Sequence, residues 1–217
     1  MAGVRIVIVA IIAYLLGSIN VAIILSKTIY KEDIREKGSG NAGLTNTLRN
    51  YGKKVAFFNL IGDVLKGVLS IILAWVIVPE EAQLLAACIA AAACVLGHNF
   101  PLYFRFKGGK GVLTTLAVML MIAPIPAVIA LIVFIVVVLL TKYVSLGSMV
   151  AALTLTILTL IRGNYFSVSG GITPLSVLAI GLATLIIIRH HANISRLIKG
   201  TENKLSLKKK KAEEEKQ

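Results

Sequence analysis

The chain has 217 residues, of which 57% are hydrophobic and 15% are charged, and it carries a formal net charge of +13. Soluble domains carry about 25% charged residues, so this composition excludes an ordinary soluble protein and indicates a polytopic membrane protein with one domain. The basic residues are not interleaved with aromatic residues on a soluble face, which argues against binding to nucleic acid.

Seven apolar segments follow one another along the chain and predict an all-α bundle of about seven transmembrane helices. They are residues 4–25, 55–78, 82–96, 112–122, 125–140, 146–161 and 175–188. The first two reach the ~20 residues that a straight span prefers, whereas the fourth would rise only about 16 Å. Short helices imply a site cut into the bundle, or polar loops that dip into the membrane.

The fourth and fifth segments meet at Ala-Pro-Ile-Pro and could instead be one kinked helix, and the distribution of charge decides between the two. With seven spans and the N-terminus outside, one face receives residues 26–54, 97–111, 141–145 and 189–217. These pieces hold 20 of the 23 Lys and Arg residues, whereas the opposite face holds Arg5 and Arg162. Lys and Arg concentrate in cytoplasmic loops. We therefore expect seven spans, an N-terminus outside and a cytoplasmic C-terminus.

The two ends of the chain differ in character. The apolar run at the start is too long for the core of a cleaved signal peptide, and no Ala-x-Ala site follows it, so it is expected to span the membrane. Residues 1–203 are expected to form a single transmembrane domain. Residues 204–217 hold a block of four lysines and then a block of three glutamates, which predicts a disordered cytoplasmic tail. The excess positive charge also favours anionic lipid.

Polar clusters gather on the predicted cytoplasmic face. They are GSGNAGLTNTLRNYG at residues 38–52, GHNFPLYFRFKGGKG at 97–111, KYVSLGS at 142–148 and RHHANISRLIKGTEN at 189–203. Glycine lets the backbone approach a ligand closely, successive N–H groups bind anions, and Lys or Arg supplies the opposite charge. Together the clusters predict a site for phosphate.

Each cluster has a plainer interpretation when it is taken alone. Lys110 is followed by Gly rather than by the Ser or Thr of a P-loop, so KGGKG could be a basic turn at the membrane edge. Arg49 could reach toward lipid headgroups, and Ser145 could cap the helix that follows it. Asp63 and Lys66, three residues apart within a span, are expected to form a structural ion pair. The shared face of the clusters favours a common site.

Three stretches resemble the sequence blocks of the bacterial acyl-phosphate:glycerol-3-phosphate acyltransferases, the PlsY-type family. They are SGNAGLTNTLR, GHNFPLYFRFKGGKGV and RHHANISRLIKGTE, which begin at Ser39, Gly97 and Arg189. The resemblance extends from the first span through residue 202. Leu44 and Leu113 stand where Ala is common in the family, and neither change removes a polar group.

The resemblance implies a multi-pass enzyme of the bacterial inner membrane with its active site on the cytoplasmic face. Such an enzyme transfers a fatty acyl group from acyl phosphate to the sn-1 hydroxyl of glycerol 3-phosphate. It releases lysophosphatidic acid and phosphate, in the first step of phospholipid synthesis. The expected partners are these two substrates and membrane lipid, without nucleic acid, cofactor or metal, and a monomer is compatible with the sequence.

The resemblance also assigns residues to the site. The implied catalytic residues are Ser39, Arg49, Lys107, His190 and Asn193. The implied substrate-binding residues are Gly40, Asn41, Gly43, Thr45, Asn46, Gly108, Gly109, Lys110, Gly111 and Ser145. Among them, the phosphate of acyl phosphate is expected at Ser39, Thr45, Lys107 and Ser145. Glycerol 3-phosphate is expected at Arg49, His190 and Asn193. Glu202 is expected to fix the tail.

Direct attack is the expected mechanism, because acyl phosphate is a mixed anhydride with a good leaving group. No cysteine lies in a polar loop, and none of His98, His190 and His191 has an Asp five residues later, so the His-x4-Asp pair of other acyltransferases is missing. Positioning and stabilisation of developing charge must then carry catalysis. Either His190 or the phosphate of the substrate could be the base.

Two other classes of function remain as alternatives. A transporter of organic phosphates would place its site near the midplane, on broken helices in repeated halves, whereas here the polar groups gather at one face and no repeat is found. A non-enzymatic scaffold for anionic lipid would explain the basic tail but not the Gly-Asn-Thr-Arg pattern of the first block.

Overall fold

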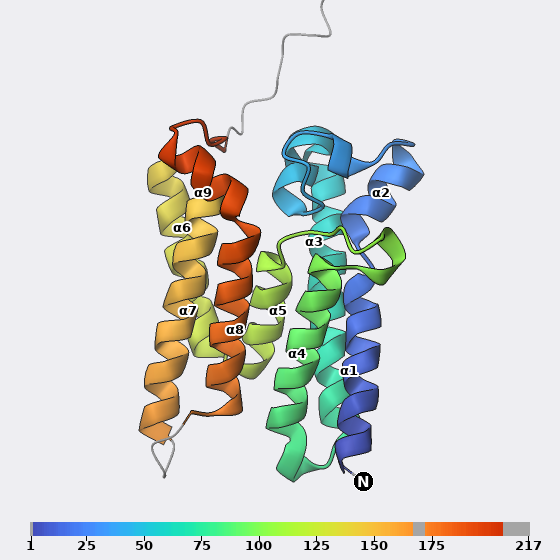
Figure 1. Ribbon diagram of the computed structural model, residues 1–217, viewed down its shortest axis with the longest axis vertical. Helices are drawn as coiled ribbons and strands as arrows, with labels where there is room; N and C mark the ends of the chain where they lie inside the picture. Colours follow the sequence, from blue (N-terminus) through green and yellow to red (C-terminus); the bar gives the residue numbers. More distant parts are fainter. Residues whose placement is uncertain (1, 167–171, 206–217) are drawn as a thin grey trace, which may run out of the picture.

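The structure is a computed structural model that describes residues 2–166 and 172–205, and its longer helices lie roughly along one axis (Figure 1). The α-helices are α1 (Ala2–Ser18), α2 (Val21–Ile29), α3 (Leu44–Ile77), α4 (Gln83–Asn99), α5 (Val112–Ile122), α6 (Pro124–Thr141), α7 (Val144–Phe166), α8 (Pro174–Arg189) and α9 (His191–Ile198). Short 3-10 turns are formed by Ile34–Glu36, Glu80–Ala82 and Leu102–Phe104. The all-α prediction is confirmed for the described residues. Most of the predicted tail lies outside them.

Candidate membrane spans in the described residues number five, or six when a bent pair is included. The five are Ala2–Ile29, Leu44–Ile77, Glu80–Phe104, Pro124–Thr141 and Val144–Ile161. The bent pair consists of α8 and α9, whose axes differ by 57°. The remaining apolar helix, α5, has 11 residues and is too short for a straight span. Every predicted apolar segment lies on a helix or a helix pair, but helix length alone supports five or six spans rather than seven.

The chain between α5 and α6 forms two separate helices. Ala123 ends α5 with φ −138° and ψ 68°, and Pro124 occupies the first turn of α6. Proline is tolerated there because the first N–H groups of a helix lack an intrahelical partner. In Figure 1, α5 leads away from the end with the polar loops and α6 returns to it. α5 therefore enters the bundle only part of the way.

The first predicted span, residues 4–25, is divided into α1 and α2. Asn20 causes the division, because its side chain accepts a hydrogen bond from the backbone N–H of Ile23 (3.1 Å) and so caps the start of α2. Its amide nitrogen donates to the carbonyl of Ala42 (3.2 Å). The break therefore ties α2 to the first polar block.

The first polar block, which lies outside the predicted apolar segments, is partly helical. Gly43 is the N-cap residue of α3, so residues 44–52 already belong to that helix. Gly52 interrupts it with φ +79° and ψ −176°, a conformation that glycine adopts without the penalty of a side chain. The N-terminus of α3 is thereby placed at the polar end of the bundle.

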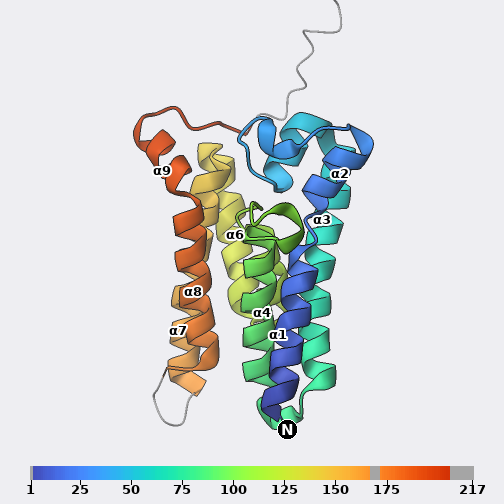
Figure 2. The same ribbon diagram turned by 45° about the vertical axis from the view of Figure 1, so that its right-hand side comes forward.

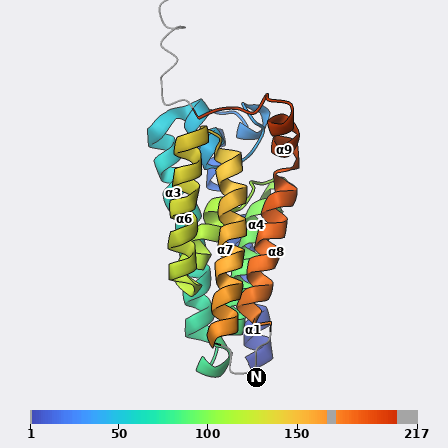
Figure 3. The same cartoon turned by 90° about the vertical axis from the view of Figure 1, so that its left-hand side faces the viewer.

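The helices form two groups that meet along α4 and α8. In the first group, α1 packs most extensively on α4, and both contact α3. In the second group, α6 packs on α7, which packs on α8. Figure 2 shows the first group, and Figure 3 shows α6, α7 and α8 side by side. A Cβ atom added at Gly17 would overlap the carbonyl of Cys94, and one added at Gly97 would overlap that of Tyr14. Small residues of this kind let membrane helices approach closely.

Candidate active site

A cavity of about 540 Å³ opens at the polar end and extends between α3, α5, α6 and α7. Its polar part is lined by the residues Ser39, Asn41, Gly43, Thr45, Asn46, Arg49, His98, Lys110, Gly111, Ser145, Ser148, His190, Asn193, Arg196 and Glu202. Its apolar part is lined by residues that include Leu116, Ala127, Ala130, Phe134 and Leu155. One continuous space therefore joins a set of charged and amide side chains to a slot that could hold an acyl chain.

The N-terminus of α3 contributes backbone donors to this cavity. Gly43 caps the helix without a side-chain hydrogen bond, and the N–H of Thr47 donates to Gly43 O (3.0 Å). Gly43, Leu44 and Thr45 line the cavity. Because the first N–H groups of a helix lack intrahelical acceptors and carry partial positive charge, this end of α3 suits an anion.

Asn46 holds the loop before α3 in shape. Its Oδ1 accepts from the backbone N–H of Ser39 (3.0 Å), and its Nδ2 donates to the carbonyls of Ile34 (3.2 Å) and Lys37 (3.0 Å). Asn50 Nδ2 also donates to Asn46 Oδ1 (3.0 Å). The amide of Asn46 is thus used by the protein itself, and it presents Ser39 at the rim of the cavity.

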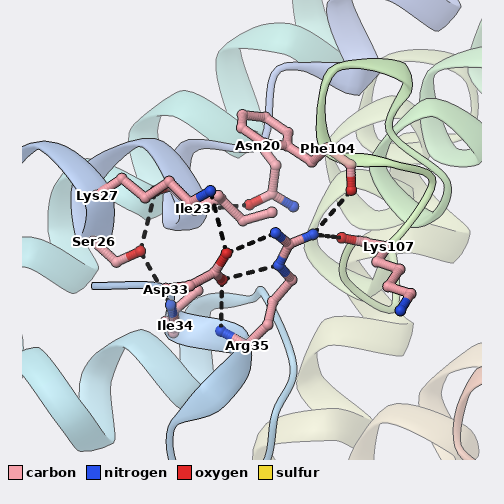
Figure 4. A network of polar contacts seen from close by, with 9 residues as sticks. All are labelled: Asn20, Ile23, Ser26, Lys27, Asp33, Ile34, Arg35, Phe104 and Lys107. Carbon is pink, nitrogen blue, oxygen red and sulfur yellow. Dashed lines mark hydrogen bonds and ion pairs between the residues drawn. The ribbon is translucent and has the colours of Figure 1, made fainter. Parts of the chain in front are cut away.

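A clamp between Asp33 and Arg35 joins the turn that precedes the first polar block to the second polar block (Figure 4). Arg35 Nη1 donates to the carbonyls of Phe104 (2.9 Å) and Lys107 (3.0 Å), while Nε and Nη2 donate to the two carboxylate oxygens of Asp33 (2.9 and 2.6 Å). The hydrogen bonds from Arg35 lower the pKa of Asp33 well below its ordinary value. Lys27 Nζ lies 3.3 Å from the same carboxylate. The clamp fixes where the second block turns.

The Gly108–Gly109 pair is packed against protein rather than exposed to the cavity. The N–H of Gly108 donates to Asn99 O (3.2 Å) and that of Gly109 to His98 O (3.1 Å). The carbonyl of Gly109 accepts from Arg189 Nη2 (3.0 Å). A Cβ atom at Gly108 would overlap the carbonyl of His98. These two glycines therefore allow a close turn whose N–H groups already have acceptors.

The two lysines of the second block have different surroundings. Lys107 is exposed and its side chain points away from Arg35 (Figure 4), outside the cavity lining. Lys110 is half-buried, lines the cavity and donates to Asn193 Oδ1. Burial lowers the pKa of Lys110 to about 8, against an opposing effect of Glu202. In this geometry Lys110 faces the cavity, whereas Lys107 does not.

Glu202 connects three elements at the rim of the cavity. Its Oε1 accepts from Ser145 Oγ (2.8 Å) and Asn193 Nδ2 (2.7 Å), and its Oε2 accepts from Arg196 Nε (2.7 Å). Burial acts to raise the pKa of Glu202, but these three donors outweigh it and lower the pKa. Glu202 thus holds the start of α7, α9 and the segment after α9 together.

His190 lies at the bend between α8 and α9 and is buried in the cavity wall. Its Nδ1 is 2.7 Å from the carbonyl of Ile186, which can only accept, so Nδ1 carries the proton and Nε2 keeps a lone pair in the neutral ring. Asn193 follows one turn later and shares the cavity. Arg49 lines it from α3 and donates to Asn203 O (3.1 Å).

The structure brings most of the predicted site residues together. Those that line the cavity are Ser39, Asn41, Gly43, Thr45, Asn46, Arg49, Lys110, Gly111, Ser145, His190 and Asn193. Those outside its lining are Gly40, Lys107, Gly108 and Gly109. Among the described residues, no group of three or more His, Cys, Asp or Glu is placed to hold a metal ion.

Four cavity-lining residues with titratable side chains were not assigned to the site from the sequence: Asp63, His98, Arg196 and Glu202. The expected ion pair of Asp63 and Lys66 is present (2.7 Å), but His98 Nδ1 joins it, 2.9 Å from Lys66 Nζ. A carboxylate within an apolar run was the sequence feature that could have indicated this cluster, because charges at membrane depth are costly.

Comparison with known proteins agrees with this geometry. The sequence profile described as glycerol-3-phosphate acyltransferase matches residues 7–200. The glycerol-3-phosphate acyltransferase of Thermoanaerobacter pseudethanolicus is 43% identical over 202 residues, which are 93% of this chain and 96% of that protein. That of Shouchella clausii is 46% identical over 197 residues, 90% and 93% of the two chains.

The chain belongs to the glycerol-3-phosphate acyltransferase family. Its fold is also similar to crystal structures of PlsY (YgiH), described as an integral membrane glycerol 3-phosphate acyltransferase. The glycerol 3-phosphate form of that protein has a TM-score of 0.83 and 34% identity, and covers 93% of this chain and 96% of its own. The lysophosphatidic acid form has a TM-score of 0.79 and 33% identity, with 93% and 95% coverage. This member of the acyltransferase family is therefore a multi-pass membrane protein.

Proposed function

We propose that this protein transfers a fatty acyl group from acyl phosphate to the sn-1 hydroxyl of glycerol 3-phosphate, producing lysophosphatidic acid and phosphate. The observation that carries the proposal is one continuous cavity, in which donors for phosphate open directly into an apolar slot. The relatives bear the name glycerol-3-phosphate acyltransferase, and the PlsY structures are those of glycerol 3-phosphate and lysophosphatidic acid forms. Acyl phosphate as the donor rests on the resemblance of the three blocks.

The donors of the cavity fall into two groups that suit the two substrates. The first turn of α3, with Ser39 and Thr45, offers N–H and hydroxyl groups to the phosphate of acyl phosphate. Lys110 lines the same cavity and takes the countercharge role that the family resemblance implied for Lys107. Arg49 and Asn193 then hold glycerol 3-phosphate, because guanidinium and amide donors recognise phosphate and hydroxyl oxygens.

The reaction proceeds by direct attack in this arrangement. The sn-1 oxygen forms a bond to the acyl carbon, the bond from that carbon to the phosphate oxygen breaks, and phosphate leaves with the electron pair. The hydroxyl proton goes to His190 Nε2 or to the phosphate of the substrate. Fixed donors stabilise the charge that develops on the acyl oxygen and on the leaving phosphate.

The cavity is proposed to face the cytoplasm of a bacterial cell, at the inner membrane. The polar loops lie at the end of the bundle opposite the N-terminus (Figure 1), and they carry most of the Lys and Arg residues. Cytoplasmic loops are enriched in these residues. Both phosphorylated substrates would reach the cavity from that side, and the acyl chain would enter it from the bilayer.

Purified protein in detergent tests the proposal when it is given glycerol 3-phosphate with acyl phosphate, acyl-coenzyme A or an acyl carrier protein thioester in separate assays. We expect lysophosphatidic acid and phosphate in equal amounts from acyl phosphate alone. Transfer from a thioester but not from acyl phosphate would contradict the donor assignment. Uptake of glycerol 3-phosphate by reconstituted vesicles, without lysophosphatidic acid, would instead support the alternative of a transporter.

A further inference from the structure

A buried ionic cluster lies beneath the two glycine-rich loops. Lys66 Nζ is 2.7 Å from Asp63 Oδ1 and 2.9 Å from His98 Nδ1, and it donates to the carbonyls of Gly17 (3.3 Å) and Ile19 (3.1 Å). The side chains of His98 and Asp63 are 5% and 2% exposed. Removing an ion pair from water is costly and stabilises a fold poorly. Such a cluster at membrane depth therefore suggests a use beyond packing.

The contacts of Lys66 determine which nitrogen of His98 carries the proton. An ammonium group donates hydrogen bonds and never accepts them. His98 Nδ1, 2.9 Å from Lys66 Nζ, must therefore be the acceptor, and the proton of the neutral ring lies on Nε2. Asp63, 3.5 Å from the same Nδ1, holds Lys66 in place. The cluster fixes both the orientation and the tautomer of the ring.

The Nε2 edge of His98 lies where the two glycine-rich loops meet. A Cβ atom added at Gly109 would overlap His98 Nε2 and would lie 2.8 Å from the carbonyl of Ala42. That carbonyl already accepts from Asn20 Nδ2 (3.2 Å). His98 lines the cavity, and its Nε2 makes no hydrogen bond to any residue in the described part of the chain. A fixed N–H donor is thus left at the edge of the phosphate-binding region.

We propose that His98 is a substrate-contacting residue whose Nε2–H donates to a phosphate oxygen bound at the junction of the two loops. Asp63 and Lys66 are then positioning residues that act through the ring. The phosphate belongs either to acyl phosphate or to glycerol 3-phosphate, and both offer the same acceptor. This inference rests on the proposed function for the identity of the substrates, but binding of inorganic phosphate tests it separately.

A pair of substitutions distinguishes the role of Nδ1 from the role of Nε2 in the His98 ring. His98→Asn places an amide oxygen near Nδ1, which keeps an acceptor for Lys66 but removes the donor at Nε2. His98→Gln places an amide nitrogen near Nε2, which keeps that donor. The matched control is His191→Asn, because His191 is exposed and lies outside the cavity lining. The melting temperature of every variant is measured first.

We expect His98→Asn to lower kcat/KM by about tenfold to a hundredfold, as for the loss of one hydrogen bond to a charged group. His98→Gln should recover most of this loss, and His191→Asn should match the wild type. A rise in KM confined to acyl phosphate or to glycerol 3-phosphate identifies which phosphate His98 contacts. Equal kinetics for His98→Asn and wild type, or equal losses for His98→Asn and His98→Gln, would overturn the proposal.

Titration of the wild-type protein with inorganic phosphate provides a test that needs no folded variant and no acyl transfer. Imidazole ¹⁵N spectra of histidine-labelled protein in nanodiscs should show His98 protonated on Nε2, with a resonance that shifts on phosphate addition. Protonation on Nδ1, or a signal unchanged by saturating phosphate, would contradict the inference. If phosphate shifts the signal while no acyl transfer is detected, the proposed function fails and the role of His98 stands.

Discussion

Ser145 and Glu202 are 57 residues apart in the chain and are joined by a hydrogen bond of 2.8 Å from Oγ to Oε1. The same carboxylate also accepts from Asn193 and Arg196. The start of α7, the helix α9 and the segment after it therefore share one acceptor. Loss of that acceptor would release Asn193, which faces the cavity, as well as the segment itself.

Glu202→Ala is expected to lower kcat/KM by about tenfold to a hundredfold and to lower the melting temperature, because three donors lose a charged partner. Ser145→Ala removes one of the three bonds and should cost about fivefold, which corresponds to roughly 1 kcal/mol. Steady-state kinetics and thermal melts of both variants check this. Equal effects of the two substitutions would show that Glu202 does not organise the rim.

Lys110→Ala and Lys107→Ala form a matched pair within one turn. Lys110 faces the cavity, so its loss should raise the KM for a phosphate substrate and lower kcat/KM by about a hundredfold, as for a charged hydrogen bond. Lys107 is exposed, so its loss should cost less than about fivefold. Measuring kcat and KM of both variants, with acyl phosphate and glycerol 3-phosphate each varied in turn, would distinguish the two lysines. A larger effect at Lys107 would favour the assignment made from the sequence.

The pH dependence of kcat/KM should report the ammonium group of Lys110. Burial lowers its pKa from 10.5 to about 8, so the charge is present below about pH 8 and is lost above it. We expect kcat/KM to fall about tenfold per pH unit above that point, and Lys110→Arg to remove the fall because Arg stays charged. If the pH profiles of kcat/KM from pH 6.5 to 9.5 coincide for the wild type and Lys110→Arg, the fall above pH 8 belongs to another titratable group.

The same pKa shift predicts the effect of this lysine on stability. Between about pH 8 and 10.5, Lys110 is neutral in the folded protein and protonated in the unfolded chain. The unfolded state then binds more protons, so the contribution of Lys110 to the free energy of unfolding rises with pH in this window. Comparison of wild type with Lys110→Met in thermal melts isolates that contribution.

Ser39 is expected to act as a hydrogen-bond donor and not as a nucleophile. A nucleophilic serine needs an adjacent general base with an orienting partner, whereas Ser39 lies exposed at the rim. Ser39→Ala should lower kcat by about 10²–10³, the typical cost of one donor to developing charge. Incubation with labelled acyl phosphate, without acceptor, should give no denaturation-stable acyl-protein. A stoichiometric adduct that glycerol 3-phosphate releases would require a covalent mechanism.

Single cysteines should reveal the orientation of the bundle, after the native Cys88 and Cys94, both buried, are replaced by alanine. Cysteines that replace Ser39 or Lys204 should react with an impermeant thiol reagent added from the cytoplasmic side. One at Glu81, in the turn at the opposite end, should react from outside. All three positions are exposed in the structure. Labelling of Ser39 and Lys204 from different sides would contradict the common face of the polar loops.

The sequence predicted the helical bundle and the gathering of the polar blocks, because apolar runs and the bias of Lys and Arg are properties of the chain itself. The choice of Lys107 over Lys110 for the countercharge rested on the family resemblance, because the two lysines have the same charge and are three residues apart. In the structure, the backbone before them decides which lysine lines the cavity, because Arg105 and Phe106 have positive φ and Arg35 Nη1 donates to the carbonyl of Lys107. Such a contact across 72 residues leaves no local pattern.

Helix boundaries show the same limit. The break of the first span depends on Asn20, whose side chain caps α2 and also binds Ala42 in a distant loop. The cluster of Asp63, Lys66 and His98 likewise joins two helices, so the spacing of Asp63 and Lys66 indicated a pair but not the third member. The sequence therefore predicted which chemistry is present, and tertiary contacts decided which atoms meet.

The position of Glu202 has a consequence for the order in which the protein becomes active. A chain is synthesised from its N-terminus, and Glu202 follows every helix that the structure describes. The helices up to α7 can therefore leave the ribosome while it still holds the carboxylate that binds Ser145, Asn193 and Arg196. A nascent chain at that stage would be a membrane-inserted bundle with an incomplete rim, and activity would begin only when the last segment arrives.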